Sequence, residues 1–161
     1  MLARAGAEVF VVDRKLALAT RTAEMIGEEG GTAHAYEADL TKEAECAAMV
    51  AAAVSRFGRL DILDNNIGIG SNASVIDETQ AQWERVMTVN VEAMFLTSKY
   101  AIPAMVESGD GGAIVNISSI SAIRPRGLTV YSTSKGAVIA LTRAMAVDHA
   151  TDGIRVNCIA P

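Results

Sequence analysis

Short, mainly apolar segments alternate with longer stretches of helical spacing along the whole chain. The short segments cover residues 9–12, 33–38, 60–63, 113–117 and 154–159. Segments of this kind are typical of strands that are covered on both faces of a parallel sheet. The helical stretches cover residues 15–28, 80–107 and 131–149, with a further one between Thr41 and Gly58. This alternation predicts a doubly wound parallel sheet with helices on both faces, a three-layer α/β/α architecture.

Local signals mark several helix ends. Gly30 and Gly31 are expected to end the first helix. Thr41 is expected to cap the N-terminus of the second helix, and Gly58 stands where a C-terminal cap belongs. Pro103 lies within the stretch 80–107 and predicts a kink or a break there. The second helix has an apolar stripe formed by Cys46, Met49, Val50, Ala53, Val54 and Phe57.

Composition narrows the function classes. Half of the residues are apolar but only 4% are aromatic, so the core is expected to consist of Ala, Val, Ile, Leu and Met. The net charge of −5 argues against nucleic-acid binding, which needs a basic surface. The sequence contains no run of about 20 apolar residues, so it predicts no membrane span. The N-terminal stretch lacks the features of a signal peptide, so we expect a cytoplasmic protein.

The potential metal ligands are scattered. Cys46, Cys158, His34 and His149 stand apart from one another, without the spacing of a metal site. We therefore expect no metal, and we expect both cysteines to be buried thiols.

Tyr131 and Lys135 are the first candidates for chemistry. Residues four apart on a helix share one face. An ammonium beside a phenol favours the phenolate and lowers the pKa of the tyrosine, which can then exchange a proton with a substrate hydroxyl. Taken alone, the pair is better explained as an exposed polar helix face.

Further candidate residues are polar side chains that stand at the end of an apolar strand or inside an apolar helix. The segment 113–117 leads directly to Ser118 and Ser119, which are either turn-forming residues or catalytic hydroxyls. Asn90 lies inside an apolar helical run, where it is costly to bury without partners. It either hydrogen-bonds a neighbouring turn or marks a helix irregularity that holds a water.

The chain resembles the short-chain dehydrogenase/reductase family over essentially its whole length. The resemblance rests on the following residues in this order: Asn66-Ile67-Gly68, Asn90, Ser119 and the Tyr131–Lys135 pair. The resemblance implies a Rossmann-like fold in a single partial domain over 1–161. It also implies hydride transfer between a nicotinamide cofactor and a small alcohol or ketone.

The resemblance assigns each catalytic candidate a role. Tyr131 is the general acid/base, and Lys135 lowers its pKa and hydrogen-bonds the nicotinamide ribose. Ser119, the second serine of its pair as in the family, orients the substrate oxygen. Asn90 helps to hold a water in a proton relay to Lys135.

The resemblance also implies a set of cofactor contacts. Asp13 accepts hydrogen bonds from the adenosine ribose hydroxyls and repels a 2′-phosphate, which favours NAD over NADP. The neighbouring Arg14 either pairs with such a phosphate or is solvated, and we favour solvation. The remaining contacts are Asp39 and Leu40 at the adenine, Asn66 and Gly68 along the adenosine and ribose, Tyr131 and Lys135 at the nicotinamide ribose, and Pro161 at the turn after the last strand.

The chain departs from the family pattern in several places. Ile67 replaces the usual Ala, Asp64 stands where the strand is usually apolar, and the loop between Ser119 and Tyr131 is one residue shorter than is common. The first strand with its Gly-rich loop and the C-terminal end are missing, so we expect these 161 residues alone to be inactive. Without that central strand, the segments 9–12 and 33–38 have no strand that links them to the other three.

Two expectations concern assembly and activity. The helical stretches 80–107 and 131–149 are apolar over more than one face, which with the resemblance predicts a homo-oligomer, a dimer or a tetramer. The competing reading is a catalytically silent nucleotide-binding or structural subunit of the same fold. The complete set of Asn90, Ser119, Tyr131 and Lys135 argues against silence.

Overall fold

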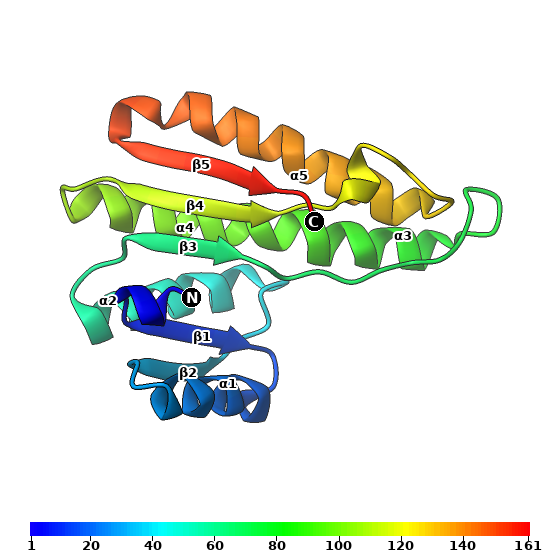
Figure 1. The fold of residues 1–161 in the computed structure, drawn as a ribbon. Helices are drawn as coiled ribbons and strands as arrows, with labels where there is room; N and C mark the ends of the chain where they lie inside the picture. The colour runs from blue at the N-terminus through cyan, green and yellow to red at the C-terminus, as the bar shows by residue number, and fades with distance from the viewer. The chain divides into compact units, whose positions relative to one another are not determined.

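A computed structural model describes all of residues 1–161, and the chain divides into two compact units, Met1–Gly58 and Arg59–Pro161. The first unit holds strands β1 (Val9–Asp13) and β2 (Ala33–Glu37), which pair in parallel. The second holds β3 (Ile62–Asn65), β4 (Gly112–Ile117) and β5 (Ile154–Ile159), in the parallel order β3-β4-β5 (Figure 1). The predicted separation of the first two strands from the other three is confirmed. The single domain remains a prediction.

The first unit is built by two helices and the β1-β2 pair. Helix α1 (Leu16–Glu28) packs on both strands, and helix α2 (Glu43–Phe57) follows β2. The ring of Phe57 meets Phe10 of β1 edge-on, with 5.9 Å between the ring centroids. As predicted, Gly58 caps α2 with a left-handed backbone (φ 78°), and Cys46, Met49, Val50 and Ala53 are buried along the stripe.

Thr41 does not cap α2, contrary to the prediction. The N-cap is Lys42, and the helix begins at Glu43. Thr41 instead closes a turn on Asp39, whose Oδ1 accepts hydrogen bonds from the Thr41 hydroxyl (2.6 Å) and amide (3.1 Å). Such local side-chain bonds compete with helix capping. Glu43 and Glu45 in the first turn of α2 place negative charge where the helix dipole favours it.

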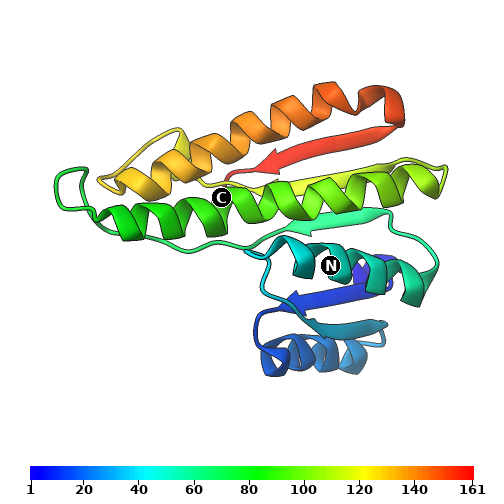
Figure 2. The same ribbon diagram turned by 180° about the vertical axis from the view of Figure 1, so that it is seen from behind.

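The second unit is covered by helices on one face. After β3 come α3 (Gln80–Met87), a π-helical segment (Thr88–Glu92) and α4 (Ala93–Glu107), and α5 (Thr129–Asp148) joins β4 to β5. Views from both sides show α4 and α5 on the same face of the three-stranded sheet (Figure 2). The core between them is aliphatic and sulfur-rich, with Met94, Met105, Ile114, Val130 and Val138 fully buried. No helix is long and apolar enough to cross a membrane.

Pro103 does not break its helix, so the break, one of the two predicted alternatives, is absent. Helix α4 runs through Pro103 to Glu107, and its buried face includes Ala101, Ile102 and Met105. Packing of such a face contributes most of the stability of a helix in a protein. The interruption of the predicted stretch 80–107 lies instead at the π-helical segment, which contains Asn90.

The position of β3 also differs from the prediction, by two residues. Its residues Ile62–Asn65 pair with 113–116 of β4, and Arg59 and Asp61 lie outside the strand in an ion pair (2.6 Å). The shift brings Asn65 opposite Asn116. The other predicted elements agree with the structure to within one or two residues at each end.

A buried polar network connects this sheet to its helices. Asn65 Nδ2 donates to Asn116 Oδ1 (2.9 Å) and Ser98 Oγ (3.2 Å), and Thr97 Oγ1 donates to Asn65 Oδ1 (2.7 Å). Asn116 Nδ2 in turn donates to Thr142 Oγ1 of α5 (2.9 Å). Both asparagine side chains are almost completely buried, so these bonds replace water that is absent there.

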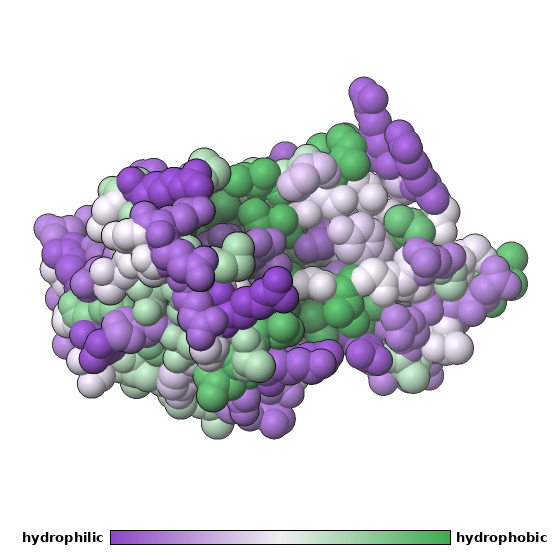
Figure 3. All heavy atoms as spheres, turned by 60° about the horizontal axis from the view of Figure 1, so that its bottom comes forward, coloured by the Kyte–Doolittle hydropathy of each residue, from purple (hydrophilic) through white to green (hydrophobic).

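The surface is mixed. Figure 3 shows hydrophobic patches among long hydrophilic side chains on one face of the molecule. In the second unit, large apolar side chains are exposed on the helices and on two loops: Val75, Ile76, Trp83, Phe95, Val106, Ile120, Ile123 and Val147. Cys46 is fully buried as expected, whereas Cys158 is only partly buried.

We expect Asn116→Ala to destabilise the protein by about 1–3 kcal/mol, because it leaves one of the two N–H groups of the buried Asn65 amide without an acceptor and removes the donor to Thr142. Thermal unfolding of the intact protein, followed by circular dichroism, measures this. The matched control is Asn157→Ala on the neighbouring strand, where the asparagine is exposed. Equal melting temperatures for the two variants would contradict the importance of the network.

Candidate active site

Lys135 lies buried at the carboxyl end of β4. Its side chain comes from α5, and its Nζ donates to the carbonyl of Ile117, the last residue of β4 (2.7 Å). Only 4% of the residue is exposed, and this burial lowers the pKa of Lys135 below its ordinary value. The Nζ atom is 5.8 Å from the centroid of the Tyr131 ring. The predicted pair therefore shares one face of α5, and that face is turned toward the sheet.

The two serines after β4 have different partners. The Ser118 hydroxyl donates to the carbonyl of Lys135 (2.7 Å), which ties the end of β4 to α5. The Ser119 Oγ accepts the amide of Ser121 (3.2 Å) at the start of a short 3₁₀ turn, Ile120–Ala122. The hydroxyl proton of Ser119 has no acceptor in the protein. Of the two hydroxyls, Ser119 is thus the one able to donate to a ligand.

Asn90 hydrogen-bonds a neighbouring loop and also lies at a helix irregularity, while the water expected there remains a prediction. It is fully buried and lies in the π-helical segment, so the helix is irregular there. Its Oδ1 accepts the amide of Ile69 (2.8 Å), and its Nδ2 donates to the Ile69 carbonyl (2.9 Å). Nδ2 also donates to Ser134 Oγ (2.9 Å), and Ser134 donates to the carbonyl of Tyr131 (2.7 Å). Asn90 thereby joins the loop after β3 to the first turns of α5.

Gly68 lies against the side chains of Lys135 and Asn90. A Cβ on Gly68 would stand 3.2 Å from Lys135 Nζ and 3.5 Å from Asn90 Oδ1. The lack of a side chain therefore leaves the space in front of Lys135 open. Asn66, two residues earlier, is exposed.

Pro161 lies beside the serine segment. Its carbonyl accepts the amide of Ile120 (2.7 Å), and the carbonyl of Ile159 accepts the amide of Ser118 (2.7 Å). These bonds hold the end of β5 next to Ser119. The second unit thus brings together Gly68, Asn90, Ser119, Tyr131, Lys135 and Pro161, all from segments at the carboxyl ends of its strands, where open α/β sheets bind ligands.

The remaining candidates belong to the first unit. Asp13 ends β1, and its Oδ1 accepts the amide of Lys15 (2.8 Å), while its other oxygen accepts no hydrogen bond. Arg14 is exposed. The carbonyl of Asp13 accepts the amide of Ala38 (3.1 Å), which draws the segment before Asp39 toward the end of β1.

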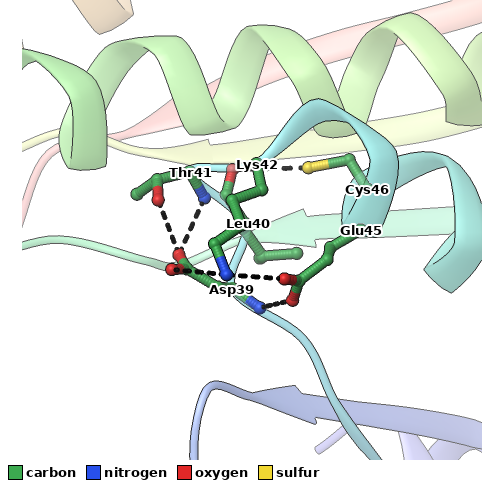
Figure 4. Close-up of polar contacts among 6 residues, drawn as sticks. All are labelled: Asp39, Leu40, Thr41, Lys42, Glu45 and Cys46. Atoms are coloured by element: carbon green, nitrogen blue, oxygen red, sulfur yellow. Dashed lines mark hydrogen bonds and ion pairs between the residues drawn. The ribbon is translucent and has the colours of Figure 1, made fainter.

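Asp39 and Leu40 lie in a tight turn before α2 (Figure 4). The hydrogen bonds from Thr41 hold the pKa of Asp39 below its ordinary value. Glu45 reaches back from α2 to accept the Asp39 amide (2.6 Å), and its carboxylate also pairs with Lys42 Nζ (2.9 Å). The carbonyl of Leu40 accepts the thiol of Cys46 (3.3 Å). Burial raises the pKa of that thiol to about 11.

Sequence reasoning missed several residues that shape these sites. Ser134 was overlooked because a serine in a helix is unremarkable until its partner is known. Asn65 and Asn116 could have been found, since each is an amide at the end of a mainly apolar strand. Glu37, which accepts the amide of Leu16 (2.8 Å), gave no signal because its partner lies far away in the sequence.

A model of the family described as short chain dehydrogenase matches residues 1–161, the whole chain. The chain belongs to this family. The solved structure of a short-chain dehydrogenase/reductase from Burkholderia xenovorans is similar to it, with a TM-score of 0.95 and 38% identity over 99% of this chain. The expected family and Rossmann-like α/β fold are thus confirmed for this chain.

Among the curated relatives are two proteins from Xanthobacter autotrophicus. One, 2-(S)-hydroxypropyl-CoM dehydrogenase 3, is 40% identical over 98% of this chain. The other, inactive 2-(S)-hydroxypropyl-CoM dehydrogenase 2, is 42% identical over 98% of it. The chain spans 62% and 67% of these two relatives and 64% of the solved structure.

The turn at Asp39 predicts a pH dependence of stability in this short-chain dehydrogenase. Because the folded-state pKa of Asp39 is lowered, its stabilising contribution is present above the unfolded pKa of about 3.9 and is lost as the pH falls through the folded value. We expect Asp39→Asn to lower the melting temperature near neutral pH. The difference from wild type should stay nearly constant from about pH 7 to about pH 5 and should shrink as the pH falls below about 4.

Melting curves over this pH range provide the measurement, with Glu24→Gln on the exposed side of α1 as the control. A difference between wild type and Asp39→Asn that stays constant down to the lowest pH would show that ionisation of Asp39 does not stabilise the turn.

Proposed function

We propose that this chain is part of an oxidoreductase that transfers a hydride between a nicotinamide cofactor and a small alcohol or ketone. The observation that carries this proposal is the buried ammonium of Lys135 beside Tyr131, held by the carbonyl of Ile117. A cation near a phenol favours the phenolate. Tyr131 then acts as the general acid/base, exchanging a proton with the substrate oxygen.

The neighbouring side chains support this role. Ser119, whose hydroxyl proton is free, donates to the substrate oxygen and stabilises its developing charge. Asn90 fixes the loop at Ile69 and the turn of α5 at Ser134. The π-helical segment around Asn90 alters the pairing of the backbone carbonyls, and we propose that a water held there relays protons to Lys135.

The residues of the second unit fit one part of a nicotinamide cofactor, which supplies the hydride chemistry when bound. The open space at Gly68 exposes Lys135 Nζ toward a ligand, and this group is a suitable donor to the nicotinamide ribose. Tyr131 contacts the same ribose. Asn66 and Gly68 follow the adenosine and ribose, and Pro161 lines the end of β5.

The residues of the first unit fit the adenosine part. Asp13 has a free carboxylate oxygen, which suits the two hydroxyls of a ribose. Asp39 and the backbone of Leu40 offer an acceptor and a donor to the edge of an adenine. A carboxylate at Asp13 opposes a 2′-phosphate, so we propose NAD rather than NADP. Arg14 remains a solvated side chain in this proposal.

The alternative is a catalytically silent nucleotide-binding or structural subunit. It is kept because one relative that is 42% identical is named inactive. The geometry around Lys135 favours the enzyme, because burying an ammonium is costly and a subunit without chemistry gains nothing from it. We also propose that the protein acts in the cytoplasm, without nucleic-acid or membrane partners.

We expect Tyr131→Phe in the intact protein to lower kcat by a factor of about 100 or more, since general acid/base groups contribute roughly 10²–10⁴-fold. Cofactor affinity should change little, because the ring is retained. Turnover is followed by NADH absorbance with a panel of small alcohols and ketones, and affinity by NADH fluorescence.

Tyr36→Phe is the matched control. It removes the same hydroxyl from a tyrosine that packs against Phe10 in the first unit, 5.1 Å between ring centroids. An intact protein that binds NADH but turns over no alcohol or ketone would favour the silent subunit. Full activity in Tyr131→Phe would remove Tyr131 from its role.

We expect the intact protein to be a homo-oligomer, because α3, α4 and α5 expose Trp83, Phe95, Val106 and Val147 and apolar helix faces are normally covered. Sedimentation velocity should show a dimer or a tetramer, and Phe95→Glu should shift the distribution toward monomer. Ile76→Glu, at a 90% exposed loop residue, should leave it unchanged. A wild-type protein that sediments only as a monomer would refute the expectation.

A further inference from the structure

A second carboxylate lies beside Asp13 at the carboxyl end of the first sheet. In the register of β1 and β2, Asp13 is paired with Glu37, the last residue of β2. Paired residues on neighbouring strands point to the same face of a sheet. Two carboxylates therefore flank the point where the chain leaves β1 and enters α1.

Both carboxylates hold the amides at the start of α1. Lys15 N donates to Asp13 Oδ1 and Leu16 N donates to Glu37 Oε2, each at 2.8 Å. The N-cap residue, Lys15, contributes no side-chain hydrogen bond of its own. The first N–H groups of a helix have no partner within the helix, so the two carboxylates take the donors that an incoming anion would otherwise find.

We infer that Glu37 determines nucleotide selectivity by excluding a phosphate from the 2′-position of the adenosine ribose. The inference rests on the proposed function, in which Asp13 binds that ribose. A 2′-phosphate at this position needs backbone amides or basic side chains. Here the amides of Lys15 and Leu16 are engaged, and the charges of Asp13 and Glu37 both repel the phosphate.

The neighbouring basic residues are not paired with these carboxylates. Arg14 and Lys15 are exposed, and neither side chain forms an ion pair with Asp13 or Glu37. Removal of the Glu37 charge leaves these two cations and one carboxylate at the site. The local balance then changes from neutral to positive, which favours a phosphate.

The test compares NAD and NADP binding to the intact protein by isothermal titration calorimetry, for wild type, Glu37→Gln and Glu37→Ala. Glutamine keeps an oxygen for the amide of Leu16 and removes only the charge, whereas alanine also frees that amide. We expect the ratio of NADP to NAD affinity to rise about tenfold in Glu37→Gln and further in Glu37→Ala. NAD affinity should change by less than about threefold.

Glu24→Gln is the control for the overall charge, because it removes one carboxylate from the exposed surface of α1 and should leave the ratio unchanged. A wild-type measurement adds a check that needs no variant. Added salt screens repulsion between exposed charges, so the NADP to NAD affinity ratio of wild type should rise between low and moderate ionic strength.

The outcomes separate the two proposals. A wild type that prefers NAD, with an unchanged ratio in both Glu37 variants, overturns the inference and leaves the proposed function intact. A wild-type ratio that falls with added salt also overturns it. A folded wild type that binds neither nucleotide overturns the proposed function and this inference together.

Discussion

A buried ammonium constrains the whole second unit. Lys135 Nζ is removed from water, and such a charge is stable only with partners placed for it. One partner is the carbonyl of Ile117, so the end of β4 and the second turn of α5 must stay in contact. Ser118 strengthens the same junction through the carbonyl of Lys135. Helix, strand and catalytic candidates are thereby fixed by a few bonds around one side chain.

The surroundings of Lys135 are arranged from more distant segments. Asn90 uses its amide to join the loop at Ile69 to Ser134, and it is placed for this by the π-helical segment. Gly68 follows on the same loop and contributes space rather than a side chain. A buried lysine with a lowered pKa beside such a position is typical of a functional site. Lys135 thus both holds α5 against the end of β4 and supplies a charged group for chemistry at the site.

Local sequence patterns identified the parts of the structure that depend on local spacing. The Tyr131–Lys135 pair follows from helical periodicity, and the separation of Ser118 from Ser119 follows from strand alternation. Errors arose where a specific side-chain partner or tertiary packing decides the outcome. Thr41 was misread because the Asp39 carboxylate draws its hydroxyl away from the helix. At Pro103 the packing of α4 outweighs one lost hydrogen bond, so the helix continues. The bounds of β3 depend on the side-chain amide of Asn116. The role of Glu37 depends on the backbone amide of Leu16, which is distant in the sequence.

The facing amides of Asn65 and Asn116 also affect how β3 and β4 find each other during folding. A slip of one residue would turn the apolar side chains of β3 to the opposite face. A slip of two residues would keep the faces but set Asn65 opposite Ile114, which cannot accept a hydrogen bond from its side chain. The hydrogen bond from Asn65 Nδ2 to Asn116 Oδ1 would then be lost, and the freed donor and acceptor would each cost roughly 1–3 kcal/mol if they stayed buried. An aliphatic pair at these positions would pack equally well in either alignment, whereas the asparagines make one alignment unique.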